Sequence, residues 1–276
     1  MTDRYAVIGN PVAHSLSPKI HAMFAAQTAQ DISYEKRLAP LDGFVETVNA
    51  LISEGGLGAN VTLPFKLDAY DMADVMSERV RHARAANTLR FSDNRIFADN
   101  TDGVGLVRDV SSNLGFELEG KRVLLMGAGG AARGVLLPLL EARPTILVIA
   151  NRTVEKALQL AQSNQHQPAA LHTVISGRGF AELSGQRFDL VINATSSSLS
   201  DELPPLPDDL FAPGALAYDM MYGKGLTSFL AFAEASNVER LADGLGMLVE
   251  QAAESFLIWR GVRPDTLPVM RALRQG

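Results

Sequence analysis

The sequence predicts an α/β protein with two domains, and three observations support this. The chain has 276 residues, more than one hydrophobic core usually organises. Short apolar runs alternate with longer amphipathic ones from end to end, which is typical of β-α-β units around a mostly parallel sheet. A glycine-rich turn, residues 127 to 132, follows one apolar run and opens a helical one. This order predicts that one domain is Rossmann-like.

The first hundred residues contain apolar runs of strand length, separated by amphipathic runs of helix length. We expect strands near Tyr5–Gly9, Ser33–Leu38, Leu57–Thr62 and Thr88–Phe91. Helices are expected near Pro18–Thr28, Phe44–Ser53 and Phe65–Asp71.

A second series of strands and helices begins at Lys121. Its predicted strands are Arg122–Met126, Thr145–Ala150, Leu171–Ile175, Leu190–Asn193 and Leu216–Asp219. Helices are expected from the glycine turn to about Ala142, and over Val154–Ser163, Met247–Arg260 and Asp265–Arg274. The proline-rich stretch Leu203–Pro213 is predicted to be a loop, because proline fixes φ and lacks a backbone donor.

Composition excludes several classes of function. The chain has no cysteine, so disulfides, thiolate zinc sites and a cysteine nucleophile are excluded. Its five histidines show no metal-binding spacing, and no metal is expected. A net charge of -6 without blocks of like charge argues against nucleic acid or an anionic membrane as partner. The sequence shows neither a secretory signal nor an apolar run of membrane-spanning length, so we expect a cytoplasmic, soluble protein.

The glycine turn matches the G-x-G-x-x-G/A pattern of dinucleotide-binding units. Gly127 permits a tight turn, Gly129 lets the backbone approach a pyrophosphate, and Ala132 is small enough for a helix to pack on the strand. Free N–H groups at the helix N-terminus favour the anion. The predicted contact residues of this turn are Gly127, Ala128, Gly129, Gly130 and Ala131. A merely structural turn is the alternative.

The residues after the next predicted strand favour NADP over NAD. An NAD-binding unit places an Asp or Glu there for the ribose hydroxyl. This chain instead has Asn151, Arg152 and Thr153, with Lys156 one turn further along. Arg152 can pair with a 2′-phosphate or stack on adenine, and Thr153 can donate its hydroxyl. The alternative is an N-cap threonine followed by solvated charges.

Several short polar motifs lie outside the nucleotide unit, in a definite order. They are Ser15-Leu-Ser17-Pro-Lys, Asn60-Val-Thr62-Leu-Pro-Phe-Lys66, Ala86-Asn87-Thr88, Asn100-Thr-Asp102-Gly, Tyr218-Asp-Met220-Met-Tyr222 and Gly244-Leu-Gly-Met247-Leu-Val-Glu-Gln251. In order and approximate spacing, these motifs resemble those of the shikimate dehydrogenase family. The resemblance covers essentially the whole chain and includes the Asn-Arg-Thr signature; Lys156 stands where many members have arginine.

The resemblance implies a substrate site and a reaction, the NADPH-dependent reduction of 3-dehydroshikimate to shikimate in the synthesis of chorismate and aromatic amino acids. It implies that Lys66 and Asp102 form the catalytic pair beside the reacting carbonyl, with Lys66 either the proton donor or mainly an electrostatic anchor. The implied substrate-binding residues are Ser15, Ser17, Thr62, Lys66, Asn87, Asp102, Tyr222 and Gln251. Further cofactor contacts are implied for Asn193, Thr195, Met220, Gly244 and Met247.

Those residue types suit the chemistry, because a ring ketone needs a hydride and a proton for the developing alkoxide. The motif order also implies a discontinuous substrate domain, residues 1–102 and 244–276, around a Rossmann-like NADP-binding domain over 103–243. Closure of the two domains would bring substrate and nicotinamide together. A monomer or a homodimer is expected.

Each motif also has an ordinary structural interpretation, and only their combination favours a catalytic site. Ser17-Pro18 is an ordinary helix start with Ser17 as N-cap and Pro18 at the first position, Lys66 a solvated lysine, and Asp102-Gly103 a turn. The rival functions are a quinate/shikimate dehydrogenase that uses NAD, and a catalytically silent nucleotide-binding sensor. A methylenetetrahydrofolate dehydrogenase-like enzyme shares the two-domain plan but fits the serines and the Asn-Arg-Thr signature poorly.

Overall fold

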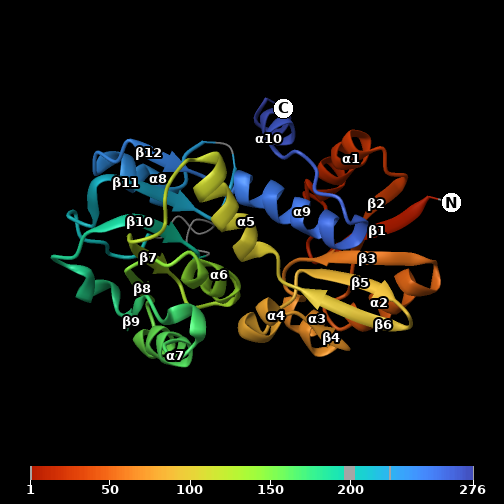
Figure 1. Ribbon diagram of the computed structural model, residues 1–276, viewed down its shortest axis with the longest axis horizontal. Helices are drawn as coiled ribbons and strands as arrows, with labels where there is room; N and C mark the ends of the chain where they lie inside the picture. Colours follow the sequence, from red (N-terminus) through yellow and green to blue (C-terminus); the bar gives the residue numbers. More distant parts are fainter. Residues whose placement is uncertain (1, 196–202, 224, 276) are drawn as a thin grey trace. The chain divides into compact units, whose positions relative to one another are not determined.

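A computed structural model describes residues 2–195, 203–223 and 225–275. The chain forms two compact units (Figure 1). The first comprises Met1–Gly105 and Leu248–Gly276, and the second is Leu106–Met247. The chain passes between the units inside two helices, α5 (Asp102–Arg108) and α9 (Leu245–Arg260). The first unit is therefore discontinuous in sequence.

The first unit contains a six-stranded sheet in the order β2-β1-β3-β5-β6-β4. The strands are β1 (Asp3–Gly9), β2 (Ile32–Leu38), β3 (Gly56–Val61), β4 (Val75–Met76), β5 (Thr88–Ser92) and β6 (Arg95–Asp99). Strands β1, β2 and β3 are parallel, whereas β5 runs antiparallel to both of its neighbours. The sheet is mixed because β5 and β6 form a hairpin through a two-residue Asp-Asn turn with positive φ.

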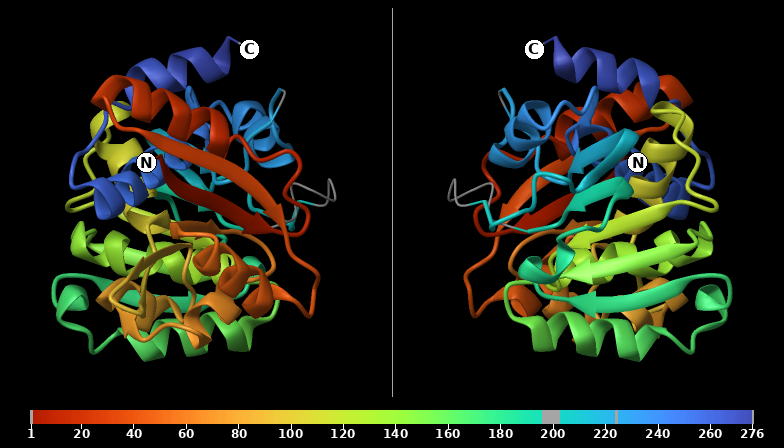
Figure 2. Two further views of the ribbon diagram at one scale, coloured as in Figure 1. Left: turned by 90° about the vertical axis from the view of Figure 1, so that its right-hand side faces the viewer. Right: turned by 90° about the vertical axis from the view of Figure 1, so that its left-hand side faces the viewer.

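Helices cover both faces of this sheet. Successive side chains of β1 point to opposite faces and are buried on both, so each face needs an apolar cover. Ala6 and Ile8 pack with α2 (Phe44–Ser53), α3 (Lys66–Asp71) and α4 (Glu78–Ala83) in one core. A second core joins α1 (Ser17–Thr28), the part of α9 after Met247, and α10 (Leu267–Arg274). The left view of Figure 2 faces this unit.

The second unit contains an all-parallel sheet in the order β12-β11-β10-β7-β8-β9. Its strands are β7 (Arg122–Met126), β8 (Ile146–Ala150), β9 (Val174–Arg178), β10 (Phe188–Asn193), β11 (Phe211–Asp219) and β12 (Arg240–Ala242). Sequence order reverses between β7 and β10, which is the doubly wound arrangement of dinucleotide-binding domains. The right view of Figure 2 looks onto these strands.

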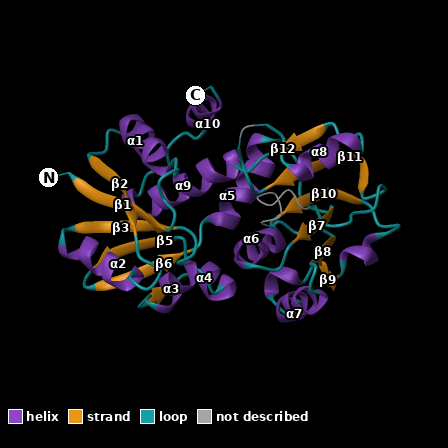
Figure 3. Cartoon of the chain, turned by 180° about the vertical axis from the view of Figure 1, so that it is seen from behind, coloured by secondary structure: helices purple, strands orange, loops and turns teal. Residues whose placement is uncertain are grey.

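Helices also pack on both faces of the second sheet, whose strands are orange in Figure 3. On one face lie α6 (Gly130–Glu141), α7 (Val154–Asn164) and the π-helical turn Asp109–Asn113. On the other lie α8 (Ser228–Ala235) and the 3₁₀ turn Phe180–Leu183. The central strands β7, β8 and β10 are buried on both faces, which explains their nearly continuous apolar sequences.

The predicted α/β class with a Rossmann-like unit is confirmed. The predicted strand Leu171–Ile175 is misplaced: the strand is Val174–Arg178, because Pro168 begins a 3₁₀ turn and Leu171 lies in the turn after it. The predicted loop Leu203–Pro213 ends earlier, since β11 begins at Phe211. Pro213 fits in that strand because the ladder to β10 shifts register between its pairs at Phe211 and Leu216, leaving no regular pair there.

Candidate active site

Lys66 and Asp102 form an ion pair in the first unit. Lys66 begins α3, just beyond the end of β3, and Asp102 begins α5, just beyond the end of β6. The Nζ atom of Lys66 lies 2.5 Å from Oδ2 of Asp102, with side chains 25% and 11% exposed. Their partial burial strengthens the interaction relative to a surface pair, and Lys66 keeps enough exposure to meet a ligand.

Asn87 connects this pair to α9. Its Nδ2 donates to Oδ1 of Asp102 at 2.8 Å and to Oε1 of Gln251 at 3.3 Å. Its Oδ1 accepts from the backbone N–H of Thr101 at 2.9 Å. These bonds fix the orientation of the carboxamide, because exchanging its oxygen and nitrogen would oppose like groups on both sides. Lys66, Asp102, Asn87 and Gln251 therefore form one polar cluster, the Lys66 cluster, although they are far apart in sequence.

Ser15 and Ser17 form a smaller polar pair at the start of α1. The Ser15 hydroxyl accepts from the backbone N–H of Ser17 at 3.3 Å, and the two hydroxyl oxygens lie 3.2 Å apart. Ser17 lies in the first turn rather than at the N-cap, which is Leu16 without a side-chain cap. The N-cap interpretation of Ser17 is therefore wrong, and its hydroxyl is not used for capping.

Two predicted substrate contacts lie outside both groups. Thr62 directly follows β3 and is partly buried, and its backbone N–H donates to Ile8. Tyr222 belongs to the second unit, where it is 38% exposed and partial burial raises the pKa of its phenol.

The glycine turn of the second unit has the form that a dinucleotide site requires. Gly127 has a φ of +111°, and a Cβ at this position would lie 3.1 Å from the carbonyl oxygen of Ala194. Any side chain here is therefore disfavoured by both conformation and space. The turn leads through Ala128 to Gly129, the N-cap of α6, and Gly130 and Ala131 are exposed at its first turn. Ala132 is fully buried in the core below.

The end of β8 bears cations and no acid. Asn151 follows the strand, and its Nδ2 donates to the carbonyl of Thr153 at 2.9 Å. Arg152, Thr153 and Lys156 are exposed. Thr153 is the N-cap of α7, but its hydroxyl makes no capping hydrogen bond and so remains available. The glycine turn, the N-terminus of α6 and this cationic corner together fit a dinucleotide with a 2′-phosphate.

The other predicted cofactor residues surround the carboxyl ends of β10 and β11. Asn193 is fully buried; its Nδ2 donates to Asp219 at 3.2 Å, and its Oδ1 accepts from the hydroxyl of Thr195 at 2.6 Å. A Cβ at Gly244 would lie 2.1 Å from the carbonyl oxygen of Met220, so this approach requires glycine. Met247 is 7% exposed and packs in the core of the unit.

Comparison with known proteins shows which family this geometry belongs to. Three family sequence models match: the shikimate dehydrogenase substrate binding domain over residues 7–89, shikimate / quinate 5-dehydrogenase over 109–200, and the shikimate 5′-dehydrogenase C-terminal domain over 244–274. The shikimate dehydrogenase (NADP(+)) of Nitrosospira multiformis is 62% identical over 100% of this chain and 98% of its own.

The chain belongs to the shikimate dehydrogenase family.

Two solved structures extend the likeness. An Ael1 enzyme from Pseudomonas putida has a TM-score of 0.93 and 54% identity, covering 99% of this chain and 98% of its own. The shikimate 5-dehydrogenase of Thermus thermophilus, in complex with NADP(H) and shikimate, has a TM-score of 0.85 and 32% identity, covering 99% of both chains.

The protein also contains a buried network of side-chain hydrogen bonds, the Tyr34 network, that the sequence did not reveal. Tyr34 donates to Oδ1 of Asn60 at 2.7 Å, and Nδ2 of Asn60 donates to the hydroxyls of Thr88 at 3.2 Å and Ser255 at 2.9 Å. The Thr88 hydroxyl donates to Oδ1 of Asn87, and this bond joins the Tyr34 network to the Lys66 cluster. One signal could have found Ser255: it lies one helical turn after Gln251, on the same side of α9.

Two side chains at the buried end of the Tyr34 network, Tyr34 and His21, have shifted pKa values. Burial raises the pKa of Tyr34 well above its ordinary value, while a hydrogen bond with Ser17 acts in the opposite direction. His21 stacks on the Tyr34 ring at 4.2 Å and is fully buried. Neither of its ring nitrogens has a partner in hydrogen-bond geometry among the described residues. Burial lowers its pKa to about 3, while an interaction with Asn60 acts in the opposite direction. His21 is therefore neutral and acts as packing.

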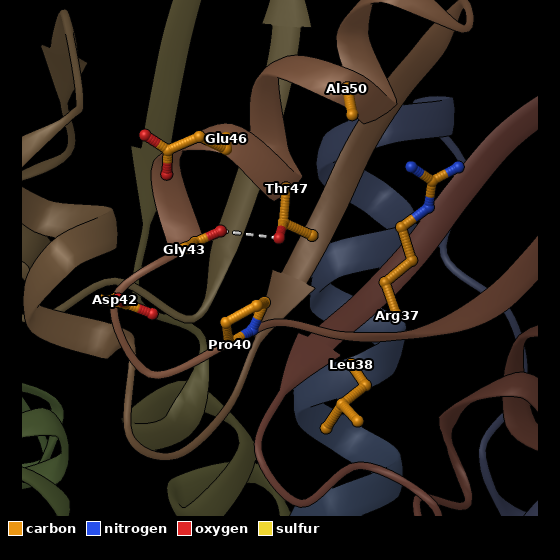
Figure 4. Close-up of a pocket in the computed structure, with 8 residues that line it drawn as sticks. All are labelled: Arg37, Leu38, Pro40, Asp42, Gly43, Glu46, Thr47 and Ala50. Carbon is orange, nitrogen blue, oxygen red and sulfur yellow. Dashed lines mark hydrogen bonds between the residues drawn. The ribbon is translucent and has the colours of Figure 1, made fainter.

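Other features of this family member lie apart from the site. A surface hollow of about 610 Å³ lies between the end of β2 and α2 (Figure 4). Two of its polar side chains are engaged within the protein: Arg37 pairs with Glu35 and Glu54, and the Thr47 hydroxyl donates to the carbonyl oxygen of Gly43. In the described part of the chain, no group of three possible metal-binding side chains occurs. No helix in that part is long and apolar enough to cross a bilayer.

Proposed function

We propose that the chain reduces 3-dehydroshikimate to shikimate with NADPH, and catalyses the reverse reaction, as an NADP-dependent shikimate dehydrogenase. The observation that carries this proposal is the Lys66 cluster, which presents a cation and several fixed hydrogen-bonding groups. A ring ketone that becomes an alcohol needs such a cation where negative charge develops on oxygen. Membership of the family and the cationic corner after β8 support the same reaction and cofactor.

NADPH, when bound, supplies the hydride that reduces the ring ketone. Lys66 holds a proton at Nζ next to the expected position of the carbonyl oxygen, and Asp102 orients that ammonium from 2.5 Å. Asn87 and Gln251 are proposed to hydrogen-bond the ring hydroxyls. Ser15, Ser17 and Thr62 are proposed to hold the carboxylate end with Tyr222.

The cofactor is proposed to bind along the glycine turn, residues 127–131, with its pyrophosphate at the N-terminus of α6. Arg152, Thr153 and Lys156 are proposed to select the 2′-phosphate, and Asn151 to shape that corner through its bond to Thr153. Thr195, Met220, Gly244 and Met247 are proposed to line the nicotinamide end. Asn193 is buried and would act there through Thr195.

The remaining proposals concern the organisation of the protein. Residues 1–102 and 244–276 are proposed to form the substrate domain, and residues 103–243 the NADP-binding domain. We further propose a monomer or homodimer that acts in the cytoplasm.

The test is a spectrophotometric assay with shikimate and either NADP⁺ or NAD⁺, repeated with quinate. We expect reduction of NADP⁺ by shikimate, and a fall in kcat of roughly 10²- to 10⁴-fold in Lys66→Ala, because a positioned acid contributes about that factor. A Lys66→Ala variant with unchanged kcat would refute the role of the Lys66 cluster. Preference for NAD⁺ or quinate would establish the rival dehydrogenase, and binding of NADP⁺ without turnover would establish the sensor.

A further inference from the structure

Arg178 is the last residue of β9, and the structure places it directly beside the cationic corner after β8. Ala150, the last residue of β8, is its register partner in the parallel ladder. The backbone N–H of Asn151 donates to the carbonyl oxygen of Arg178 at 3.1 Å. Neighbouring strands lie about 4.8 Å apart, so an arginine here is within a side-chain length of the Asn-Arg-Thr segment.

A second contact fixes the other side of Arg178. A Cβ on the next residue, Gly179, would lie 2.9 Å from Cγ2 of Val154, the first residue of α7. The chain around Arg178 therefore packs against the turn that carries Arg152 and Thr153. Gly177 also packs on α7, so alternation along β9 directs the Arg178 side chain away from that helix, at the carboxyl edge of the sheet.

The guanidinium of Arg178 has no partner among the residues that the structure describes. Its Nε atom is buried and has no hydrogen-bond acceptor, although the residue as a whole is only partly buried. The nearest acid in sequence, Glu182, is engaged elsewhere, because Oε2 accepts from the backbone N–H of Gly179 at 2.6 Å. A partly buried cation whose donors are unused has its hydrogen bonds available for a ligand.

We infer that Arg178 is a third cationic side chain of the 2′-phosphate subsite and increases the preference for NADP over NAD. This inference rests on the proposed cofactor. A 2′-phosphate brings negative charge and several acceptor oxygens to a corner where three cations otherwise repel one another. Arginine suits this role because its planar donors can bind two phosphate oxygens at once.

Isothermal titration of the full-length protein with NADP⁺ and with NAD⁺ tests the inference without measuring turnover. Arg178→Gln removes the charge and keeps a polar, though shorter, side chain. We expect about a tenfold weaker Kd for NADP⁺, the usual scale of one lost charge-assisted bond, and a Kd for NAD⁺ within about twofold of the parent. Arg178→Lys keeps the charge and should lie between the parent and Arg178→Gln.

Two further variants separate this inference from the proposed cofactor. Arg187→Gln makes the same change at an exposed arginine before β10, at the opposite end of a strand, and should leave both constants unchanged. Arg152→Gln should weaken the binding of NADP⁺ and leave the binding of NAD⁺ nearly unchanged. If Arg152→Gln does so and Arg178→Gln does not, only the inference about Arg178 fails.

If Arg178→Gln weakened the binding of NADP⁺ and of NAD⁺ equally, the inference would also be overturned, because the arginine would then contact a part common to both cofactors, such as adenine. A parent protein that binds NADP⁺ and NAD⁺ equally would overturn the proposed cofactor and this inference together. Unchanged thermal unfolding of each variant shows that the changes in affinity do not come from misfolding.

Discussion

Single side chains of the Lys66 cluster were found from sequence only because short motifs around them are specific. Asn87 and Gln251 are separated by 163 intervening residues, yet the structure brings their side-chain atoms to 3.3 Å. Their catalytic and binding roles remain predictions. Tyr34 could not be predicted in the same way, because a tyrosine in a strand has no local feature that shows its partner, and Ser255 could be found only through its position one helical turn after Gln251.

His21 leads to a prediction about pH at the scale of one residue. Its folded pKa of about 3 lies below the ordinary 6.5, so protonation favours the unfolded state. This contribution to stability is complete above pH 6.5 and is lost as the pH falls from there toward 3. We expect about 2 kcal/mol of unfolding free energy to be lost from this group between pH 7 and pH 5.

The measurement is urea unfolding at both pH values, compared with His21→Phe, which keeps an aromatic ring on Tyr34 but cannot titrate. The difference in stability between pH 7 and pH 5 should be about 2 kcal/mol smaller in the variant. Identical pH dependence of the two proteins would show that His21 does not carry this effect.

At the scale of elements, edge strands were harder to predict than central ones. The central strand β7 was predicted with its observed bounds, because a strand buried on both faces is a continuous apolar run. The predicted bounds of β9 were wrong because hydrophobicity did not indicate burial in this segment. Leu171 and Val174 are apolar, yet they are 79% and 66% exposed. The short strands β4 and β12 pair only through two and three residues and have no periodicity to detect.

The junction between α9 and α10 provides an element-scale prediction. Arg263 lies between these helices and pairs with Glu250 and Glu254, each at 2.7 Å. Glu250 is 3% exposed, so Arg263→Ala leaves a buried carboxylate with the Thr266 hydroxyl but without this cation. We expect a loss of about 3 kcal/mol in unfolding free energy, the scale of a broken buried ion pair.

The fluorescence of Trp259, the single tryptophan, measures this loss because the residue lies on α9 and its Nε1 donates to Leu89 in the same unit. Arg271→Ala, which removes an exposed arginine from α10, is the matched control and should change stability by less than about 0.5 kcal/mol. Equal effects of the two variants would contradict a role for the buried pair.

At the scale of the whole molecule, the α/β class and the Rossmann-like unit followed from periodicity and the glycine turn. The mixed character of the first sheet did not, because the β5–β6 hairpin is joined by Asp93 and Asn94 rather than by a glycine turn. Each unit has cores of its own, so each can respond separately to a ligand.

We therefore expect NADP⁺ to protect the second unit more than the first from hydrogen exchange. At about 100 times Kd, binding stabilises the folded state by about 2.7 kcal/mol, so amides that exchange through unfolding of the unit slow about a hundredfold. Buried amides of β7 and β8 should show this effect, and those of β3 and β5 a smaller one. Uniform slowing in both units would show that they unfold together, and the effect should shrink in Arg152→Gln.

The discontinuity of the first unit has a consequence during synthesis. A ribosome makes residues 106–247 before residues 248–276, so the second unit can complete its folding while the first still lacks α10 and most of α9. Until those helices emerge, Ile20 and Phe24 of α1 have no apolar partner from α9 or α10. We therefore expect the nascent chain to pass through a stage in which the second unit can fold while the apolar face of α1 still lacks its partners.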